Sequence, residues 1–313
     1  MIDNTRSWKF PLLLAAAAAC WGFGTVMTKH ALGAVPPFTL PVVQLAASSA
    51  FLWAIGLARG LRPKANRTTA RLALSGLLEP GFTITFAVLG LKLTTATMTT
   101  LIFAAQPALV VVMAWLLIGE RLRRPVLGLA LLAVLGVGLV AGVNSGAGNA
   151  GSALGNLLVI ISLACCTLYL VWSRRWVMQM HPVMLVALQQ SVGLVWTLAI
   201  WPVELSQIGF SSLAAISPGV WLWAAASGIV YYALGFWLYI AGLKHASASL
   251  AAPFLSLTPI FGVAAATLLL GERLAPAQWL GAALILAAVI AISQQSTSGD
   301  VRTSKLESIT PNL

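Results

Sequence analysis

The sequence predicts an all-α integral membrane protein in which ten transmembrane helices form two inverted five-helix repeats. Two observations support this prediction: the composition and an internal repeat. Hydrophobic residues make up 59% of the chain and charged residues only 8%, whereas about 25% of the residues of a soluble domain are charged. Because lipid cannot satisfy backbone polar groups, a chain of long apolar runs is expected to cross the membrane as helices.

The repeat joins residues 90–122 to residues 242–274. Three landmarks recur 152 residues later: Gly90-Leu91-Lys92 as Gly242-Leu243-Lys244, Pro107 as Pro259, and Gly119-Glu120-Arg121-Leu122 as Gly271-Glu272-Arg273-Leu274. Three earlier residues recur 145 residues later: Cys20 as Cys165, Pro37 as Pro182, and Gln44 as Gln189. A fixed period of this kind indicates two homologous halves. The change of register requires an insertion in the second half, which we expect in a loop from Glu204 to Ser217.

Five apolar runs are expected to span the membrane in the first repeat, residues 11–143. Each is close to the roughly 20 residues that a span needs. The first run resembles a signal peptide as far as Cys20, but it continues through Trp21 to Met27, as a span does and a cleaved leader need not. The expected spans are Pro11–Lys29, Phe38–Ala58, Leu72–Leu91, Thr97–Ile118 and Pro125–Val143.

The second repeat, residues 156–293, is expected to supply five more spans. A polar, glycine-rich linker, residues 144–155, separates the halves, and polar tails occupy residues 1–10 and 294–313. The expected spans are Asn156–Trp172, Pro182–Val203, Pro218–Ala241, Ser247–Leu270 and Pro276–Ser293.

Basic residues predict the orientation. If both termini lie in the cytoplasm, 15 of the 18 Lys and Arg residues fall on the cytoplasmic side and the linker lies outside, as the positive-inside rule requires. The net charge of +11 is therefore assigned to loops next to membrane lipid and not to nucleic-acid binding. An odd number of spans in each half makes the second repeat enter from the opposite side, so the repeats are inverted.

Two proline-containing fourth helices, each running into Gly-Glu-Arg-Leu, resemble those of the EamA-type transporters of the drug/metabolite transporter superfamily. The resemblance covers residues 11–293. It implies a carrier of the cytoplasmic (inner) membrane, usually an exporter of small metabolites such as amino acids, with a central cavity lined by the first four helices of each half. Inverted repeats are typical of secondary transporters, whose binding site lies near the midplane.

Glu79 is the only acid well inside an expected span, and Ser75 and Thr83 lie one turn away on the same face. Pro80 and Gly81 follow it, so a helix break is expected there. Intramembrane acids tend to be functional, and Glu79 is predicted to couple transport to protons or to bind a substrate amine. The alternative is a buried structural acid, or one that reaches the inner surface. The equivalent position in the second half is Tyr231.

Gln44 and Gln189 occupy matching positions in the second helix of each half. They are predicted to be polar clamps for the substrate at a symmetric midplane site, or else interhelical hydrogen-bond bridges. Gln106 is a further binding candidate, beside Pro107. Paired prolines in the two halves, Pro107 and Pro259, predict helix breaks near a transport site, although they are equally compatible with passive kinks.

Two helix faces are predicted to form apolar walls of the site, although aromatic residues at helical spacing are more often packing residues or interface anchors. They carry Trp21, Thr25 and Thr28 on the first helix, and Tyr232, Gly235 and Tyr239 on the eighth. For the pairs Glu120-Arg121 and Glu272-Arg273 we expect anchoring of a helix end. The spacing of the small residues Gly138 and Gly142 suits a close helix–helix contact, either within the protein or across a homodimer interface.

No catalytic pattern accompanies these features. The three histidines lie at span ends without metal-ligand spacing, and neither a nucleophile elbow nor a phosphate-binding glycine loop occurs. We therefore expect no metal, no cofactor and no enzyme activity. The leading interpretation is an alternating-access exporter of small organic metabolites, with amino acids or their analogues as the favoured substrates. Two alternatives stay open: a multidrug or lipophilic-cation exporter, and an intramembrane lipid-modifying enzyme.

Overall fold

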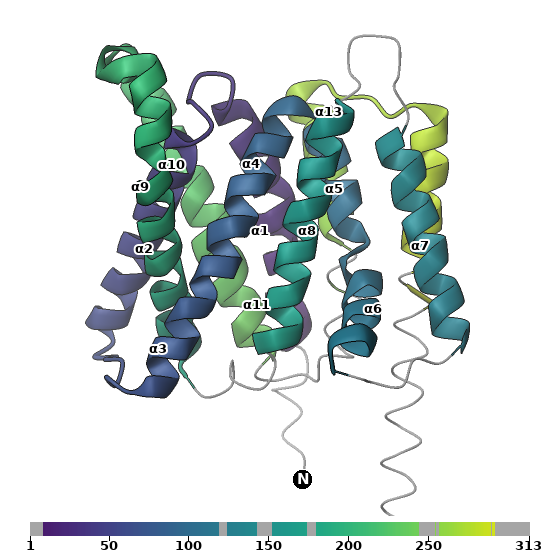
Figure 1. Cartoon of the computed structure of the whole chain (residues 1–313), viewed down its shortest axis with the longest axis horizontal. Coiled ribbons are helices and arrows are strands. Elements are labelled where there is room, and N and C mark those ends of the chain that lie inside the picture. The colour runs from purple at the N-terminus through teal and green to yellow at the C-terminus, as the bar shows by residue number, and fades with distance from the viewer. Residues whose placement is uncertain are drawn as a thin grey trace, which may run out of the picture.

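The computed structural model describes residues 9–118, 124–142, 152–173, 180–243, 254, 257–288 and 290–291 of the 313-residue chain. Every regular element in these ranges is a helix, and the helices stand side by side in one upright bundle (Figure 1). The all-α prediction is confirmed for this part of the chain.

The first repeat begins with two uninterrupted helices and continues with two broken ones. Between α3 and α4, the chain passes through a tight turn of 3-10 helix, Ser75–Leu77, and a wider π-turn, Leu78–Phe82. The helices are α1 (Lys9–Ala31), α2 (Thr39–Ala58), α3 (Arg67–Leu74), α4 (Thr83–Leu93), α5 (Ala96–Ala104), α6 (Gln106–Ile118) and α7 (Arg124–Gly142).

The described helices of the second repeat follow the same order. Its third helix contains a π-turn, Ile229–Gly235, between α10 and α11. The helices are α8 (Ala153–Ser173), α9 (Pro182–Ala214), α10 (Pro218–Gly228), α11 (Phe236–Leu243) and α13 (Thr258–Leu270), followed by an apolar helix at Pro276–Ala288.

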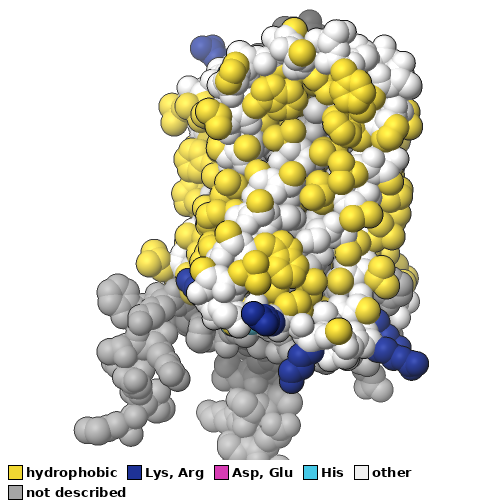
Figure 2. All heavy atoms as spheres, turned by 90° about the vertical axis from the view of Figure 1, so that its left-hand side faces the viewer, with side chains coloured by type: hydrophobic (Ala, Val, Ile, Leu, Met, Phe, Trp, Pro, Cys, Tyr) yellow, Lys and Arg dark blue, Asp and Glu magenta, His cyan; other side chains and the backbone are white. Residues whose placement is uncertain are grey.

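Five of the described helices are long and apolar enough to cross a membrane: Pro11–Ala31, Thr39–Ala58, Arg67–Leu93, Pro182–Ala214 and Pro218–Gly242. The pair Ala96–Ala104 and Ala108–Leu117, bent by 44°, would make a sixth, and shorter apolar helices accompany them. In Figure 2, hydrophobic side chains cover the height of the bundle, while Lys and Arg lie at its ends. This is the surface of a multi-pass membrane protein.

The two repeats pack reciprocally. The first helix of one repeat, α1, contacts α10, α11 and α13 of the other, and its counterpart α8 contacts α4, α5 and α6. In the same way α2 packs on α10, and α9 packs on α3. The core therefore lies between the halves, and neither half buries its apolar faces alone.

Several predicted boundaries differ from the structure. The segment Glu204–Ser217 is not a loop, because α9 continues through Pro202 to Ala214 and breaks only at Gly209, whose φ of 69° suits glycine. Glu204 resembled a span end because it is charged, yet its carboxylate accepts hydrogen bonds from the backbone N–H groups of Phe38 (2.9 Å) and Thr39 (2.7 Å). It caps the start of α2, which stabilises a helix N-terminus.

The third span also begins earlier than predicted, at Arg67 instead of Leu72. Asn66 caps this extra turn, because its side-chain oxygen accepts a hydrogen bond from the N–H of Thr69 at 2.8 Å. The last residues of the expected linker, Ala153–Gly155, belong to α8. The expected helix-end anchor Glu120-Arg121 and the repeat landmark Lys244 lie outside the described residues.

Candidate functional site

The helix between α3 and α4 is interrupted at Glu79, one residue before Pro80 and Gly81. Glu79 has φ −133° and ψ 111°, an extended conformation between two helical turns. Proline cannot donate the hydrogen bond that a helix needs at this point. Side-chain hydroxyls satisfy nearby carbonyls instead: Thr83 Oγ1 donates to Leu78 O at 2.9 Å, and Ser162 Oγ of α8 donates to Thr83 O at 2.8 Å. The break is therefore held open by the surrounding side chains.

The Glu79 carboxyl group is buried in the bundle, with 3% of the residue exposed. It is within hydrogen-bonding reach of the Thr83 hydroxyl and the Cys166 thiol, but its second oxygen, Oε2, has no hydrogen-bond partner among the described residues. No Lys, Arg or His of the described ranges forms an ion pair with it. A buried carboxylate without a cation is unstable. This group therefore needs either a proton or an incoming positive charge.

Residues from four helices meet around this carboxyl group. Cys166 comes from α8, and it accepts a hydrogen bond from the side-chain amide of Gln106 on α6 (Nε2 to Sγ, 3.0 Å). Tyr231 and Tyr232 of the second repeat lie near enough to interact electrostatically with Glu79. Sequence reasoning proposed Glu79 and Gln106 separately and missed Cys166, because a cysteine inside an apolar span has the pattern of a small core residue.

Gln44 and Gln189 do not share one set of partners. The Gln44 amide donates to Thr28 Oγ1 (2.9 Å) and Ser227 Oγ (2.8 Å), and the Gln189 amide donates to Ser75 Oγ (2.9 Å) and the Tyr169 hydroxyl (2.9 Å). Each glutamine thus links its own helix to the third helix of the other repeat. This geometry favours the bridging interpretation, although Gln44 Oε1 has no hydrogen-bond partner in the part of the chain that the structure describes.

The two predicted walls lie against each other. The Trp21 ring centroid is 5.3 Å from that of Tyr239 and 5.3 Å from that of Phe236, and Tyr232 stacks on Phe236 at 6.5 Å. Thr25 donates its hydroxyl hydrogen bond back to Trp21 O at 2.9 Å. In this conformation the aromatic residues fill the space between α1 and α11, and the Thr25 hydroxyl forms its hydrogen bond within α1.

The two predicted proline breaks occupy equivalent places, because Pro107 and Pro259 are each the second residue of a helix, α6 and α13. Between α5 and α6 the helix axis bends immediately before Gln106-Pro107, and Gln106 is left half-buried and directed at Cys166. Pro259 lies in the first turn of α13, where its missing N–H costs nothing. Glu272, after the end of α13, accepts hydrogen bonds from the N–H groups of Ala96 (2.9 Å) and Thr97 (2.8 Å). It therefore anchors a helix end, as expected, but the helix that it anchors is α5 of the other repeat.

Comparisons with known proteins agree with this architecture. The model of the EamA-like transporter family matches the chain twice, over residues 8–142 and 153–294. The uncharacterized transporter YvbV of Bacillus subtilis (strain 168) is 26% identical over 293 residues, which are 91% of this chain and 92% of that protein. A solved structure described only as "Crystal structure of protein" has a TM-score of 0.61 at 23% identity, and the match covers 91% of this chain and 96% of that one. These matches confirm the resemblance and the two repeats.

Proposed function

This chain belongs to the EamA-like transporter family, so it is a transporter and not an enzyme, and from that premise we propose a secondary active exporter of small organic metabolites. Amino acids or their analogues are the favoured substrates. The two repeats would rock about a central site and expose it alternately to each side. The site we propose is the polar cluster around Glu79.

The proposed topology has ten spans in two inverted repeats, with both termini in the cytoplasm. Its support is the distribution of charge: five basic residues, between Arg59 and Arg71, gather at the α2–α3 end of the bundle. Figure 2 shows Lys and Arg side chains at the lower end of the bundle. By the positive-inside rule this end faces the cytoplasm, and we propose the cytoplasmic membrane as the location.

The observation that carries the transport mechanism is the buried Glu79 carboxyl group with its free oxygen. We assign it the coupling role. A proton on Glu79 neutralises the group and allows the bundle to rearrange, whereas a charged carboxylate without a partner opposes closure of the site around it. Proton release on one side and uptake on the other would then couple substrate export to the pH gradient. Gln106 and Cys166 would orient the carboxyl group.

The glutamines and aromatic residues are proposed as the surroundings of the substrate. Gln44 Oε1, which has no partner among the described residues, would accept a hydrogen bond from the substrate. Gln189 would replace its hydrogen bond to Ser75 with one to the substrate. Trp21, Tyr232 and Tyr239 would supply apolar walls once α1 and α11 move apart.

A second candidate is export of lipophilic cations. It is favoured by the aromatic rings near the acid. The ring centroids of Tyr231 and Tyr232 lie 4.6 Å apart, and both residues interact electrostatically with Glu79. Aromatic faces and a carboxylate together suit a delocalised cation. In this case Glu79 would bind the substrate charge directly.

The experiment is counterflow in proteoliposomes with labelled amino acids and cationic dyes, with and without a pH gradient. Glutamine imitates the protonated carboxyl group, so Glu79→Gln is expected to keep exchange of the substrate and to lose stimulation by the gradient. The matched control is Glu204→Gln, the same chemical change at a helix cap. It should lower thermal stability and leave gradient stimulation intact.

The outcomes separate the candidates. If Glu79→Gln abolishes exchange of a cationic dye as well as gradient stimulation, Glu79 binds the cation and the second candidate replaces the first. If Glu79→Gln responds to the gradient like the wild type, Glu79 is structural and the coupling proposal fails.

A further inference from the structure

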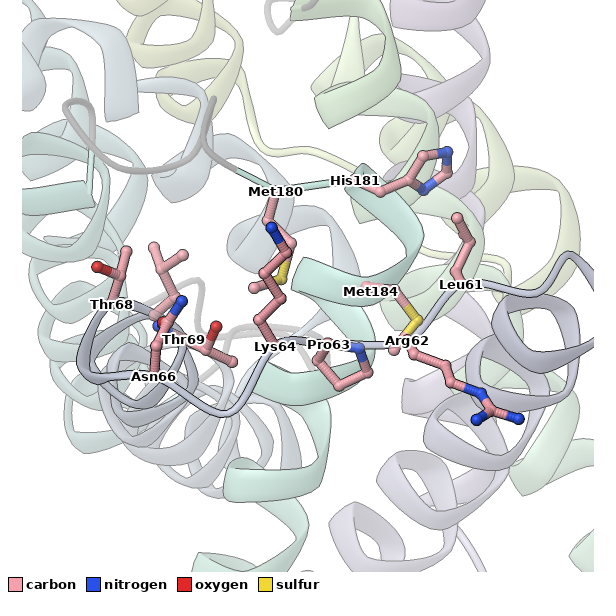
Figure 3. A pocket seen from close by; sticks show the side chains of 11 residues that line it. Leu61, Arg62, Pro63, Lys64, Asn66, Thr68, Thr69, Met180, His181 and Met184 are labelled. Atoms are coloured by element: carbon pink, nitrogen blue, oxygen red, sulfur yellow. The ribbon is translucent and has the colours of Figure 1, made fainter.

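A pocket of about 420 Å³ lies at the end of the bundle where the chain passes from α2 to α3 (Figure 3), and Glu79 is not among its lining residues. The connection between these helices forms one side, the first turns of α3 another, and the start of α9 a third. It is lined by Leu61, Arg62, Pro63, Lys64, Asn66, Thr68, Thr69, Leu72, Met180, His181 and Met184.

The pocket is basic, and no acidic residue is among the described residues that line it. Within the described part of the chain, the side chains of Arg62 and Lys64 form no ion pair or hydrogen bond. Arg59 differs, because its guanidinium lies 5.4 Å from the centre of the Trp237 ring. In Figure 3 the Lys64 side chain extends across the pocket towards Met180. Two cations therefore border a hollow to which the described residues supply no counter-ion.

The remaining lining divides into two kinds of surface. Thr68 and Thr69 bring hydroxyl groups from the first turn of α3, where the helix dipole also favours an anion. Leu61, Leu72 and Met184 form an apolar floor. A ligand that matches both surfaces carries a negative head and an apolar stem. A phosphate group on a lipid has this chemistry, and basic pockets between helices on the cytoplasmic side are suited to such head groups.

We propose that this pocket binds the phosphate head group of an anionic phospholipid of the inner leaflet. Arg62 and Lys64 neutralise the phosphate, the threonine hydroxyls donate to its oxygens, and the acyl stem follows the apolar floor. The bound lipid joins the α2–α3 connection to the start of α9, two segments from different repeats. The inference takes only the side of the membrane from the proposed topology and does not depend on the substrate or on coupling.

The test is thermal unfolding of the purified full-length protein in a neutral detergent at low salt. Phosphatidylglycerol, phosphatidylcholine and inorganic phosphate are added separately. A ligand that binds only the folded state raises Tm by an amount that grows with its concentration, on the order of 5 °C at a hundredfold excess over Kd. We expect this shift with phosphatidylglycerol and not with phosphatidylcholine.

The variants distinguish binding of the lipid in the pocket from a general attraction of the lipid to basic residues on the surface. Arg62→Gln/Lys64→Gln removes two cations from the pocket, and Arg67→Gln/Arg71→Gln removes two exposed cations of α3 that do not line it. The first should lose most of the lipid shift and the second should keep it. Thr68→Trp keeps every charge and fills the hollow, and it should also lose the shift.

Three results would overturn the proposal. An equal loss in both charge variants would mean attraction to the surface alone. An unchanged shift in Thr68→Trp would mean that the hollow is not used. The same shift with inorganic phosphate as with phosphatidylglycerol would assign the site to free phosphate and not to lipid. None of these readouts depends on transport, so the Glu79 proposal stands or falls separately.

Discussion

The third helix of each repeat offers a comparison within one molecule, because the segments α3–α4 and α10–α11 are equivalent at a spacing of 152 residues. Both place a glycine against a glutamine of the other repeat: a Cβ on Gly76 would lie 2.2 Å from Gln189 O, and one on Gly228 would lie 2.4 Å from Gln44 O. In both, the serine before that glycine accepts a hydrogen bond from the same glutamine. The shared features build the contact between the repeats.

The two segments differ immediately after this contact. The first copy carries Glu79 at an extended residue, whereas the second carries Tyr231 in a π-turn that stays helical. Their partners differ as well, since Cys166 near Glu79 corresponds to Trp21, which packs on Gly235. One copy keeps a polar cluster and the other fills the same place with aromatic rings. The glycine–glutamine contacts that both repeats share therefore build the scaffold, and the candidate site lies where the two repeats differ.

The largest effect is expected from the shared glycines. Gly76→Ala and Gly228→Ala each force a methyl group into backbone of the other repeat, which must move. Overpacking of this kind costs about 1–3 kcal/mol, and more where backbone is the obstacle. We expect both variants to lose a similar amount of Tm in detergent. Gly219→Ala is the control, because a Cβ there meets nothing within 4 Å. A large loss in only one of the two variants would break the equivalence of the contacts.

The next effect concerns the polar cluster alone. Cys166→Val removes one hydrogen-bonding group beside Glu79 and the acceptor for Gln106, while Cys166→Ser keeps both functions. We expect the valine variant to lose about tenfold in gradient-driven uptake, the equivalent of about 1.4 kcal/mol, and the serine variant to stay near the wild type. Cys165→Ala is the control on the same helix. Equal uptake by the valine and serine variants would remove Cys166 from the site.

A smaller effect is expected from the two glutamines. If both are bridges, Gln44→Leu and Gln189→Leu should each destabilise the protein by about 0.6 kcal/mol, the average for an interhelical hydrogen bond in a membrane, and by at most about 1.7 kcal/mol. Thermal unfolding measures this loss, and counterflow measures substrate affinity in the same preparations. A rise in KM without a change in Tm would make that glutamine a substrate ligand and not a bridge.

The same comparison explains what the sequence could and could not predict. The repeat registers and apolar runs predicted the helices, and Pro80-Gly81 marked the position of the interruption, because these features depend on neighbours in sequence. The role of Cys166 could not be predicted, since it depends on α8 packing against α4. The helical extension beyond Val203 was missed for a similar reason: Glu204 is satisfied by the start of α2, a segment 165 residues away.

The smallest effect is expected at the position equivalent to Glu79. Tyr231 is held by packing, because a Cβ on Gly24 would lie 2.7 Å from the Tyr231 Cβ. Tyr231→Phe keeps this ring and removes only the hydroxyl group. We expect gradient-driven uptake to stay within about twofold of the wild type, which corresponds to less than about 0.5 kcal/mol. The measurement is the same uptake assay that tests Glu79→Gln. If Tyr231→Phe also abolished the response to the gradient, the hydroxyl group would belong to the coupling site, and that site would then extend into both repeats.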